Sequence, residues 1–282
     1  MTESVATSVL GVPAPPLHGL VDSYVGYHFD GFEPGVHIGK PSRHLTLVID
    51  FDGPLRVTAS GSSAAMASSY DTSIGGLHGS PIAIHHDGRQ FGANIQLSPA
   101  GARSILGMPA SELASTIAPL DAVLGAAPTA ELRERLVTTP SWDERFALLD
   151  RTLVGLVRSR APGPRPEVAR AWDRLVATGG AVGVAALAEE VSWSRRHLTA
   201  CFRAEFGVTP KLMGRILRFE RAVELFGAPA PATLADIAAT CGYADQAHLV
   251  RDWRDFTGAS PTGWLAAETL PMRVEPDLVP TP

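Results

Sequence analysis

Apolar residues in the C-terminal third of the chain recur at the spacing of one helical face. Between residues 184 and 206 they mark two short helices that are separated by a turn at Ser192-Trp193, and the second helix begins near Ser194. The inward positions of this second helix are Leu198, Cys201, Phe202 and Phe206. Recurrence at three and four residues is typical of an amphipathic helix that packs on a core. The pattern therefore predicts a helix-turn-helix unit.

The same pattern returns about fifty residues later. Leu187-Ala188 matches Ile237-Ala238 at an offset of 50, and Leu198 matches Leu249 at an offset of 51. The turn of the second copy, near Gly242-Tyr243, has therefore gained one residue. This internal repeat predicts a second helix-turn-helix unit.

Between the two copies, residues 211–226 are predicted to form one continuous helix. Its apolar stripe consists of Leu212, Ile216, Phe219, Val223 and Phe226. Sixteen residues span roughly 24 Å at about 1.5 Å per residue. A rigid spacer of this length could hold two recognition helices near the ~34 Å that separates successive major grooves. We therefore expect one chain to read two adjacent half-sites.

The N-terminal half has a different pattern, in which short apolar runs are cut by Gly, Pro, Asp and Ser. The runs that predict strands are residues 43–51, 55–57, 82–86 and 91–97. Asp52-Gly53-Pro54 separates the first two, and Asp87-Gly88 between the last two is a hairpin-type turn signal. Amphipathic pieces follow at residues 101–106, 110–114, 130–136 and 142–157, and Ser141 with Glu144 forms a capping-box pattern.

Three prolines and a glycine between residues 158 and 166 cannot continue a helix and indicate a linker. The predicted organisation is a flexible arm (1–16), an N-terminal domain (17–157), the linker (158–166), a DNA-binding domain (167–268) and a flexible tail (269–282). The fold class is α+β, with a small, cupin-like β domain that carries helices, followed by an all-α domain with two helix-turn-helix units.

Charge gives less support to DNA binding than the pattern does. The chain carries a net charge of -5, and residues 165–268 hold twelve Arg or Lys and twelve Asp or Glu. Whether this region attracts DNA phosphates therefore depends on how its charges are placed on one face and not on their sum. No run approaches the roughly 20 apolar residues of a membrane span, and the N-terminus does not read as a secretory signal. The two cysteines suggest neither disulfides nor a zinc knuckle, and we expect a cytoplasmic protein.

The C-terminal region resembles the AraC/XylS family of transcription regulators. The likeness is carried by residues 187–198, 202–210, 218–222, 237–249 and 256–261, within a resemblance that covers about 100 of the 282 residues. In that family the second helix of each unit enters the major groove. The resemblance implies base contacts from Arg196, Thr199, Ala200, Asp245, Gln246, Val250 and Arg251. Candidates for phosphate contact are Arg195, Arg203, Arg215, Arg218 and Arg254.

Among these residues, Arg196 could pair with guanine and Gln246 with adenine, each through two hydrogen bonds. Asp245 and Asp252 place negative charge near the second groove. We therefore expect the first unit to be the main anchor on DNA and the second unit to be the weaker reader.

The N-terminal domain holds seven of the nine histidines, which are His18, His28, His37, His44, His78, His85 and His86. Imidazole suits zinc, iron or copper. No pair has the spacing and accompanying carboxylate of a known metal site, so we expect no metal, no cofactor and no catalytic residue. A metal-dependent enzyme built on this domain stays the alternative function.

Residues 43–47, 101–103 and 107–113 are similar to the sensor halves of actinobacterial AraC-type regulators. That likeness implies effector binding or dimerisation without naming a ligand. The expected function is a sequence-specific transcription regulator that binds double-stranded DNA. Further candidate partners are a small-molecule effector, RNA polymerase and a second copy of the chain, and no membrane partner is expected.

Overall fold

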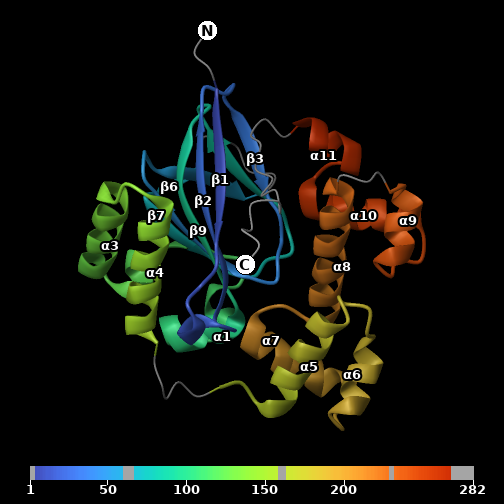
Figure 1. Cartoon of the computed structure of the whole chain (residues 1–282). Helices are drawn as coiled ribbons and strands as arrows, with labels where there is room; N and C mark the ends of the chain where they lie inside the picture. The colour runs from blue at the N-terminus through green and yellow to red at the C-terminus, as the bar shows by residue number, and fades with distance from the viewer. Residues whose placement is uncertain (1–3, 60–66, 158–162, 229–231, 268–282) are drawn as a thin grey trace.

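A computed structural model describes residues 4–59, 67–157, 163–228 and 232–267 of the chain. The predicted tail (269–282) and residues 158–162 of the predicted linker lie outside the described residues. Two domains follow each other along the chain, a β-rich one and an all-helical one, as the sequence pattern predicts (Figure 1).

Two antiparallel sheets build the N-terminal domain. The large sheet has the strand order β1-β2-β9-β4-β7-β10, and the small sheet has the order β3-β8-β5-β6. The strands are β1 (Val5–Gly11), β2 (Val21–Asp30), β3 (Gly35–Gly39), β4 (Leu45–Asp50), β5 (Leu55–Ala59), β6 (Ser68–Tyr70), β7 (Thr72–Gly75), β8 (Ile82–His86), β9 (Gln90–Leu97) and β10 (Ile117–Pro119).

Short helices lie around this domain. They are η1 (Pro15–Leu17), α1 (Pro99–Gly101), η3 (Ala102–Leu106), η4 (Ala110–Leu113), α2 (Asp121–Leu124), α3 (Ala126–Thr138) and α4 (Trp142–Leu156). Ser141 caps α4 as its sequence predicts, because its hydroxyl accepts the Glu144 backbone N–H at 3.3 Å.

One face of the large sheet is apolar and is covered by α4. Leu47 of β4 pairs with Ile95 of β9, and both are fully or almost fully buried. A Cβ placed on Gly26 would lie 2.4 Å from the ring of Trp142, so glycine lets the helix approach the strand closely. Phe146 of α4 stacks on Tyr24 at 5.6 Å. These contacts fix α4 on the sheet.

The opposite face of the same sheet is the more polar one, although Val48 and Tyr27 also lie on it. Thr46 and Asp50 alternate with the apolar residues of β4, and Asn94 and Gln96 do so in β9. Ser23 of β2 donates to the Gln96 side chain at 3.2 Å on this face. A sheet with one apolar and one polar face packs its helices on the first and leaves the second for other contacts.

Two features of this domain differ from the expectation. Residues 5–11 of the expected arm form β1, which pairs along its whole length with β2, because the uncharged run from Val5 to Leu10 suits an edge strand. Asp87-Gly88 joins β8 of the small sheet to β9 of the large sheet and closes no hairpin. A Cβ on Gly88 would lie 1.9 Å from the Phe32 carbonyl oxygen, so this turn is packed against the loop before β3.

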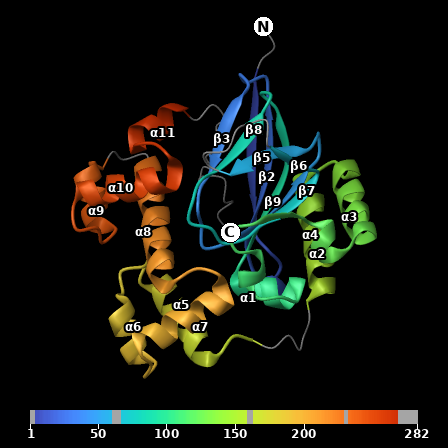
Figure 2. The ribbon, with the colours of Figure 1, turned by 180° about the vertical axis from the view of Figure 1, so that it is seen from behind.

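The C-terminal domain contains seven helices among the described residues. They are α5 (Pro166–Ala177), α6 (Val184–Glu190), α7 (Arg195–Phe206), α8 (Pro210–Gly227), α9 (Leu234–Thr240), α10 (Gln246–Thr257) and α11 (Pro261–Ala267). Figures 1 and 2 show α5, α6 and α7 at one end of α8, and α9, α10 and α11 at its other end. The predicted continuous helix between the two units is therefore confirmed.

Candidate nucleic-acid interface

The first helix-turn-helix unit consists of α6, a turn and α7. The Ser194 hydroxyl caps α7 by accepting the His197 backbone N–H at 3.2 Å. Leu198 and Phe202 are fully buried, and Trp172 of α5 stacks on Phe202 at 6.0 Å. The helix ends at Gly207, which has a left-handed φ of +77°. Capping and core packing together fix the direction of α7.

The second unit repeats this construction with α9 and α10. Thr233 and Asp236 form a reciprocal capping box at the start of α9. The turn to α10 runs from residue 241 to residue 245, one residue longer than the turn of the first unit, as the sequence offsets predict. Asp245 caps α10 by accepting the His248 backbone N–H at 2.7 Å. Its carboxylate is therefore already engaged at the helix N-terminus.

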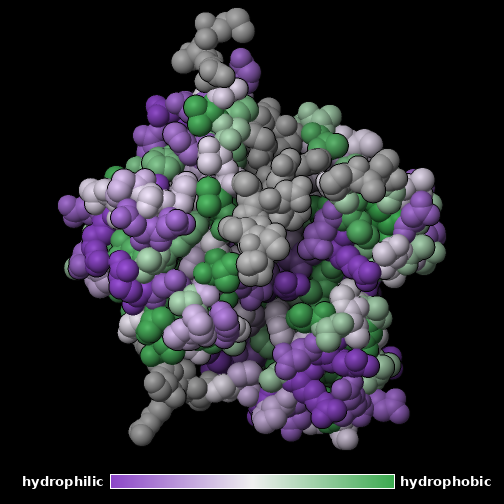
Figure 3. All heavy atoms as spheres, viewed as in Figure 1, coloured by the Kyte–Doolittle hydropathy of each residue, from purple (hydrophilic) through white to green (hydrophobic). Residues whose placement is uncertain are grey.

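The residues expected to touch bases lie on the outer faces of α7 and α10. Arg196, Ala200, Asp245, Gln246 and Arg251 are exposed, and Thr199 and Val250 are half-buried. Figure 3 shows hydrophilic side chains gathered over α5 and α6, at the end of α8 where the first unit lies. On the recognition helices themselves, Arg196 of α7 and Gln246 and Arg251 of α10 present polar side chains to solvent.

The five arginines expected at phosphates fall into two groups. Arg195, Arg203 and Arg254 are exposed on the recognition helices. Arg215 instead donates to Asp252 at 2.8 and 3.0 Å and to Asp255 at 2.6 Å, which ties α8 to α10.

Arg218 is likewise engaged inside the domain. Its Nη1 donates to the Gly180 carbonyl at 2.6 Å, and its guanidinium lies over the ring of Tyr243 at 5.5 Å. In this structure Arg215 and Arg218 hold the two units on α8.

Asp252 does not place its charge on the outer face of the second unit. Its side chain is 3% exposed and points inward to Arg215, so this part of the expected acidic surface is corrected. The inward orientation of Asp252 could have been predicted from the sequence. Asp252 lies three residues after Leu249 and four before Phe256, which are both fully buried.

A contact with the N-terminal domain was missed by the sequence pattern. Arg103 of η3 donates to both carboxylate oxygens of Glu205 on α7, each at 2.5 Å. Glu205 is nine residues after Arg196, about 180° around the helix at roughly 100° per residue. The N-terminal domain therefore holds the back of the first recognition helix and leaves its outer face open.

Three further contacts between the domains lie along α8 and beyond it. The Arg43 backbone N–H donates to Glu220 of α8 at 3.0 Å. Burial raises the pKa of Glu220, although this N–H and the nearby charges of His44 and Arg43 oppose the shift. Gly79 packs on Leu212, and Lys40 lies over the ring of Trp264 at 4.7 Å.

A cleft of about 770 Å³ also runs between the domains, with Arg254 and Asp255 on one wall.

A comparison with family models gives one match. Residues 187–267 match the model of a helix-turn-helix domain family, and this range runs from within α6 to the end of α11. The C-terminal domain is an AraC-type helix-turn-helix domain. No curated protein matches the chain in sequence.

Solved structures of two-domain proteins are similar to this chain over most of its length. Unsaturated fatty acid-bound ToxT from Vibrio cholerae is 9% identical, with a TM-score of 0.53 over 98% of this chain and 100% of that one. An apo single-site variant of ToxT from the same organism is 11% identical, with a TM-score of 0.51 over 86% and 97%. This likeness shows that the two-domain fold is shared.

A third match covers the AraC-type domain alone. The DNA-binding domain of AdpA, solved with a target DNA, is 23% identical, with a TM-score of 0.34 over 36% of this chain and 93% of that one. The family match and the exposed faces of α7 and α10 make this chain a DNA-binding transcription regulator. In the part of the chain that the structure describes, no helix is long and apolar enough to cross a membrane.

Proposed function

We propose that α7 and α10 enter adjacent major grooves of one DNA duplex and read its sequence. The observation that carries this proposal is the pair of capped, outward-facing helices joined by the single helix α8. Its 18 residues span about 27 Å at roughly 1.5 Å each. This length is close to the ~34 Å between successive major grooves on one side of a duplex.

Arg196 and Gln246 are the proposed main readers of sequence. A guanidinium matches the two acceptors of guanine, and a carboxamide matches the donor and acceptor of adenine. We assign Thr199, Ala200, Val250 and Arg251 to neighbouring base edges. Asp245 acts mainly by capping α10 and thereby aims Gln246, which follows it directly.

Phosphate contacts are assigned to Arg195, Arg203 and Arg254, whose side chains are exposed. We assign Arg215 and Arg218 to the frame between the units, because their guanidinium groups already have partners within the domain. The second unit keeps its outward Asp245 but loses the expected repulsion from Asp252. The difference in DNA affinity between the two units is therefore smaller than the residue count suggests.

The N-terminal domain is proposed to bind a small effector. Effector binding would then change the positions of α7 and α8 through the contacts at Glu205 and Glu220. ToxT, which shares the fold, has been solved with an unsaturated fatty acid, and this supports an effector role for the domain. No three His, Cys, Asp or Glu side chains meet in a metal-binding arrangement in the described residues, so the enzyme alternative gains no support. We place a non-enzymatic regulator of this kind in the cytoplasm.

A gel shift tests the proposal. The purified 282-residue chain is titrated onto the DNA upstream of its own coding region at moderate salt. Arg196→Ala and Gln246→Ala should each weaken binding about 10- to 100-fold, while circular dichroism stays unchanged. Arg151→Ala, which removes an exposed arginine from α4, is the matched control and should bind like wild type. Unchanged binding in both recognition-helix variants would overturn the assignment.

A further inference from the structure

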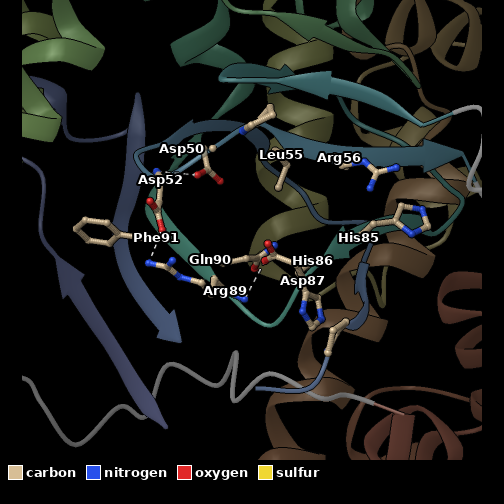
Figure 4. Close-up of a pocket in the computed structure, with 13 residues that line it drawn as sticks. Asp50, Asp52, Leu55, Arg56, His85, His86, Asp87, Arg89, Gln90 and Phe91 are labelled. Carbon is tan, nitrogen blue, oxygen red and sulfur yellow. Dashed lines mark hydrogen bonds and ion pairs between the residues drawn. The ribbon is translucent and has the colours of Figure 1, made fainter. Parts of the chain in front are cut away.

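A cavity of about 520 Å³ opens between the two sheets of the N-terminal domain. Asp50 at the end of β4 and Gln90 at the start of β9 contribute from the large sheet. Leu55 of β5 and His86 of β8 contribute from the small sheet. Figure 4 shows Asp50 and Leu55 on one side of this space, across from Gln90 and His86. The polar face of the large sheet therefore ends in a hollow that both sheets line.

The carboxyl group of Asp50 is the unusual feature of this cavity. The residue is only 6% exposed, and the one hydrogen bond that its carboxylate makes with the described residues is from the Asp52 backbone N–H at 3.3 Å. Arg133 of α3 approaches, but its Nε donates to the Asp50 backbone carbonyl at 2.9 Å and not to the carboxylate. No cation of the described residues lies within ion-pair distance of this carboxylate. A buried carboxylate without a counter-charge is unfavourable unless something supplies one.

The cations at the cavity already have partners or lie at its rim. Arg89 pairs with Asp30 at 3.1 Å and with Asp52 at 2.8 Å. His86 accepts the Gly88 backbone N–H on Nδ1 at 3.2 Å, and Arg56 is exposed. With Asp87, the lining holds three acids and two arginines, so a charged Asp50 leaves it one negative charge in excess. The uncompensated charge lies at the buried end.

Part of the cavity wall is apolar. Leu55 and Phe91 line the cavity together with Pro34 and Pro54. An apolar wall beside one buried charge fits a ligand with a carbon skeleton and one charged end. Arg89 is already paired and Arg56 lies exposed at the rim, so a carboxylate or phosphate ligand at the buried end would face Asp50 without a cation beside it. This arrangement disfavours anions at that end.

We propose that this cavity binds a small organic ammonium ion, with its nitrogen at the Asp50 carboxylate and its carbon skeleton against Leu55 and Phe91. The proposal rests on the proposed function and names the chemical class of the effector. Gln90, which is 8% exposed, lies across the cavity from Asp50 and offers a carbonyl oxygen for a second N–H of the ligand. Bound in this way, the ligand would supply the counter-charge that the fold leaves out.

Four further titratable or charged groups act on Asp50 from the surrounding elements. Arg133 of α3 favours the carboxylate, whereas Asp52 and Asp71 disfavour it. The Tyr27 hydroxyl on β2 stays neutral, because burial holds its pKa well above the usual range. Burial is the largest effect and raises the pKa of Asp50 to about 7. An ammonium ion should therefore bind well at pH 8, and its affinity should fall about tenfold per pH unit below about pH 6.

Three probes of one size separate the ligand classes. Benzylamine carries a cation at pH 8, benzyl alcohol is neutral and benzoate is an anion. The shift in melting temperature of the full chain is recorded with each probe. We expect benzylamine alone to raise it, by about 3 °C at ten times its dissociation constant. Asp50→Asn should abolish this rise, and Asp121→Asn on α2, with the same loss of charge at an exposed site, should keep it.

The same preparations are used in the gel shift, so the two proposals fail separately. DNA binding without any benzylamine effect overturns the ammonium site and leaves the regulator intact. An equal shift with benzyl alcohol or benzoate, or one that persists in Asp50→Asn, also overturns it. A benzylamine shift that is lost in Asp50→Asn, in a protein that binds no DNA, would instead overturn the proposed function.

Discussion

Arg103 holds Glu205 through two parallel hydrogen bonds on the side of α7 opposite Arg196. The Arg103 side chain is 20% exposed and that of Glu205 is 11% exposed, so the pair is largely removed from water. It joins the β domain to the first recognition helix without covering the face that points outward. Any change in the β domain that moves η3 is therefore carried to α7.

Glu205→Gln should lower the free energy of unfolding of the full chain by about 2–4 kcal/mol, because Arg103 would keep its burial and lose its counter-charge. Chemical denaturation measures this loss. Glu190→Gln is the matched control, since Glu190 pairs with Arg170 and Arg174 at the surface and should cost less than about 1 kcal/mol. Equal losses in both variants would remove the special role of the Arg103–Glu205 pair.

Alanine substitutions at two equivalent glycines distinguish the effect of domain docking from the effect of backbone strain. Gly207 and Gly258 end α7 and α10 with φ of +77° and +79°. A Cβ on Gly207 would lie 2.1 Å from the Ala114 side chain of the β domain, whereas a Cβ on Gly258 meets nothing within 4 Å. Both alanine variants lose about 1 kcal/mol from the left-handed backbone, and Gly207→Ala must also push the domains apart.

We therefore expect Gly207→Ala to lower the melting temperature more than Gly258→Ala does and to increase proteolysis between residues 157 and 166. Limited proteolysis with analysis of the fragments detects this change. If the two variants are cut at the same rate, the first unit does not dock on the β domain as described.

The two turns differ at one strained residue. Ser192 in the first turn has a φ of +57°, and Gly242 in the second has a φ of +76°. Serine is unfavourable in this left-handed region and glycine is not. Ser192→Gly should stabilise the chain by about 0.5 kcal/mol, and Gly242→Ala should destabilise it by about 1 kcal/mol. Thermal unfolding should show a higher melting temperature for Ser192→Gly and a lower one for Gly242→Ala. A clearly lower melting temperature for Ser192→Gly would contradict the strain at this turn.

Stability should depend on pH through Asp50. Its pKa is raised from 3.8 to about 7 in the folded protein, so the folded state binds the proton more tightly than the unfolded state does. Raising the pH from about 4 to about 7 therefore removes about 4 kcal/mol of stability through Asp50 alone.

Asp50→Asn removes this dependence. Its advantage over wild type in free energy of unfolding should grow between about pH 4 and pH 7 and then stay level. Urea denaturation at pH 5 and pH 8 measures the difference. Asp121→Asn, at an exposed position, should show no such growth, and the same flat result for Asp50→Asn would mean that Asp50 is not buried as a charge.

Much of the C-terminal domain could be predicted because its helices are local and periodic. The spacing from Leu212 to Phe226 defined α8, and the offsets of 50 and 51 located the longer second turn. Asp252 could also have been placed inward from its neighbours on α10. The faces of a regular helix follow from residue spacing alone.

The N-terminal domain was less predictable because its contacts are distant along the chain. Asp87-Gly88 looks the same in sequence whether it joins paired strands or, as found, two different sheets. The partner of Glu205 is 102 residues away. Nothing local marks Asp50 as buried, since its environment comes from α3 and from both sheets. Such pairings are decided by tertiary packing and not by local pattern.

The most direct test of the central claim is the selection of binding sites by the full chain from random DNA duplexes. Two sequence elements, about 10 base pairs apart on one face of the duplex, are the predicted result. Arg196→Ala should lose its preference at one element, and Gln246→Ala should lose its preference at the other. A single selected element, or the same altered site in both variants, would contradict reading by two helices.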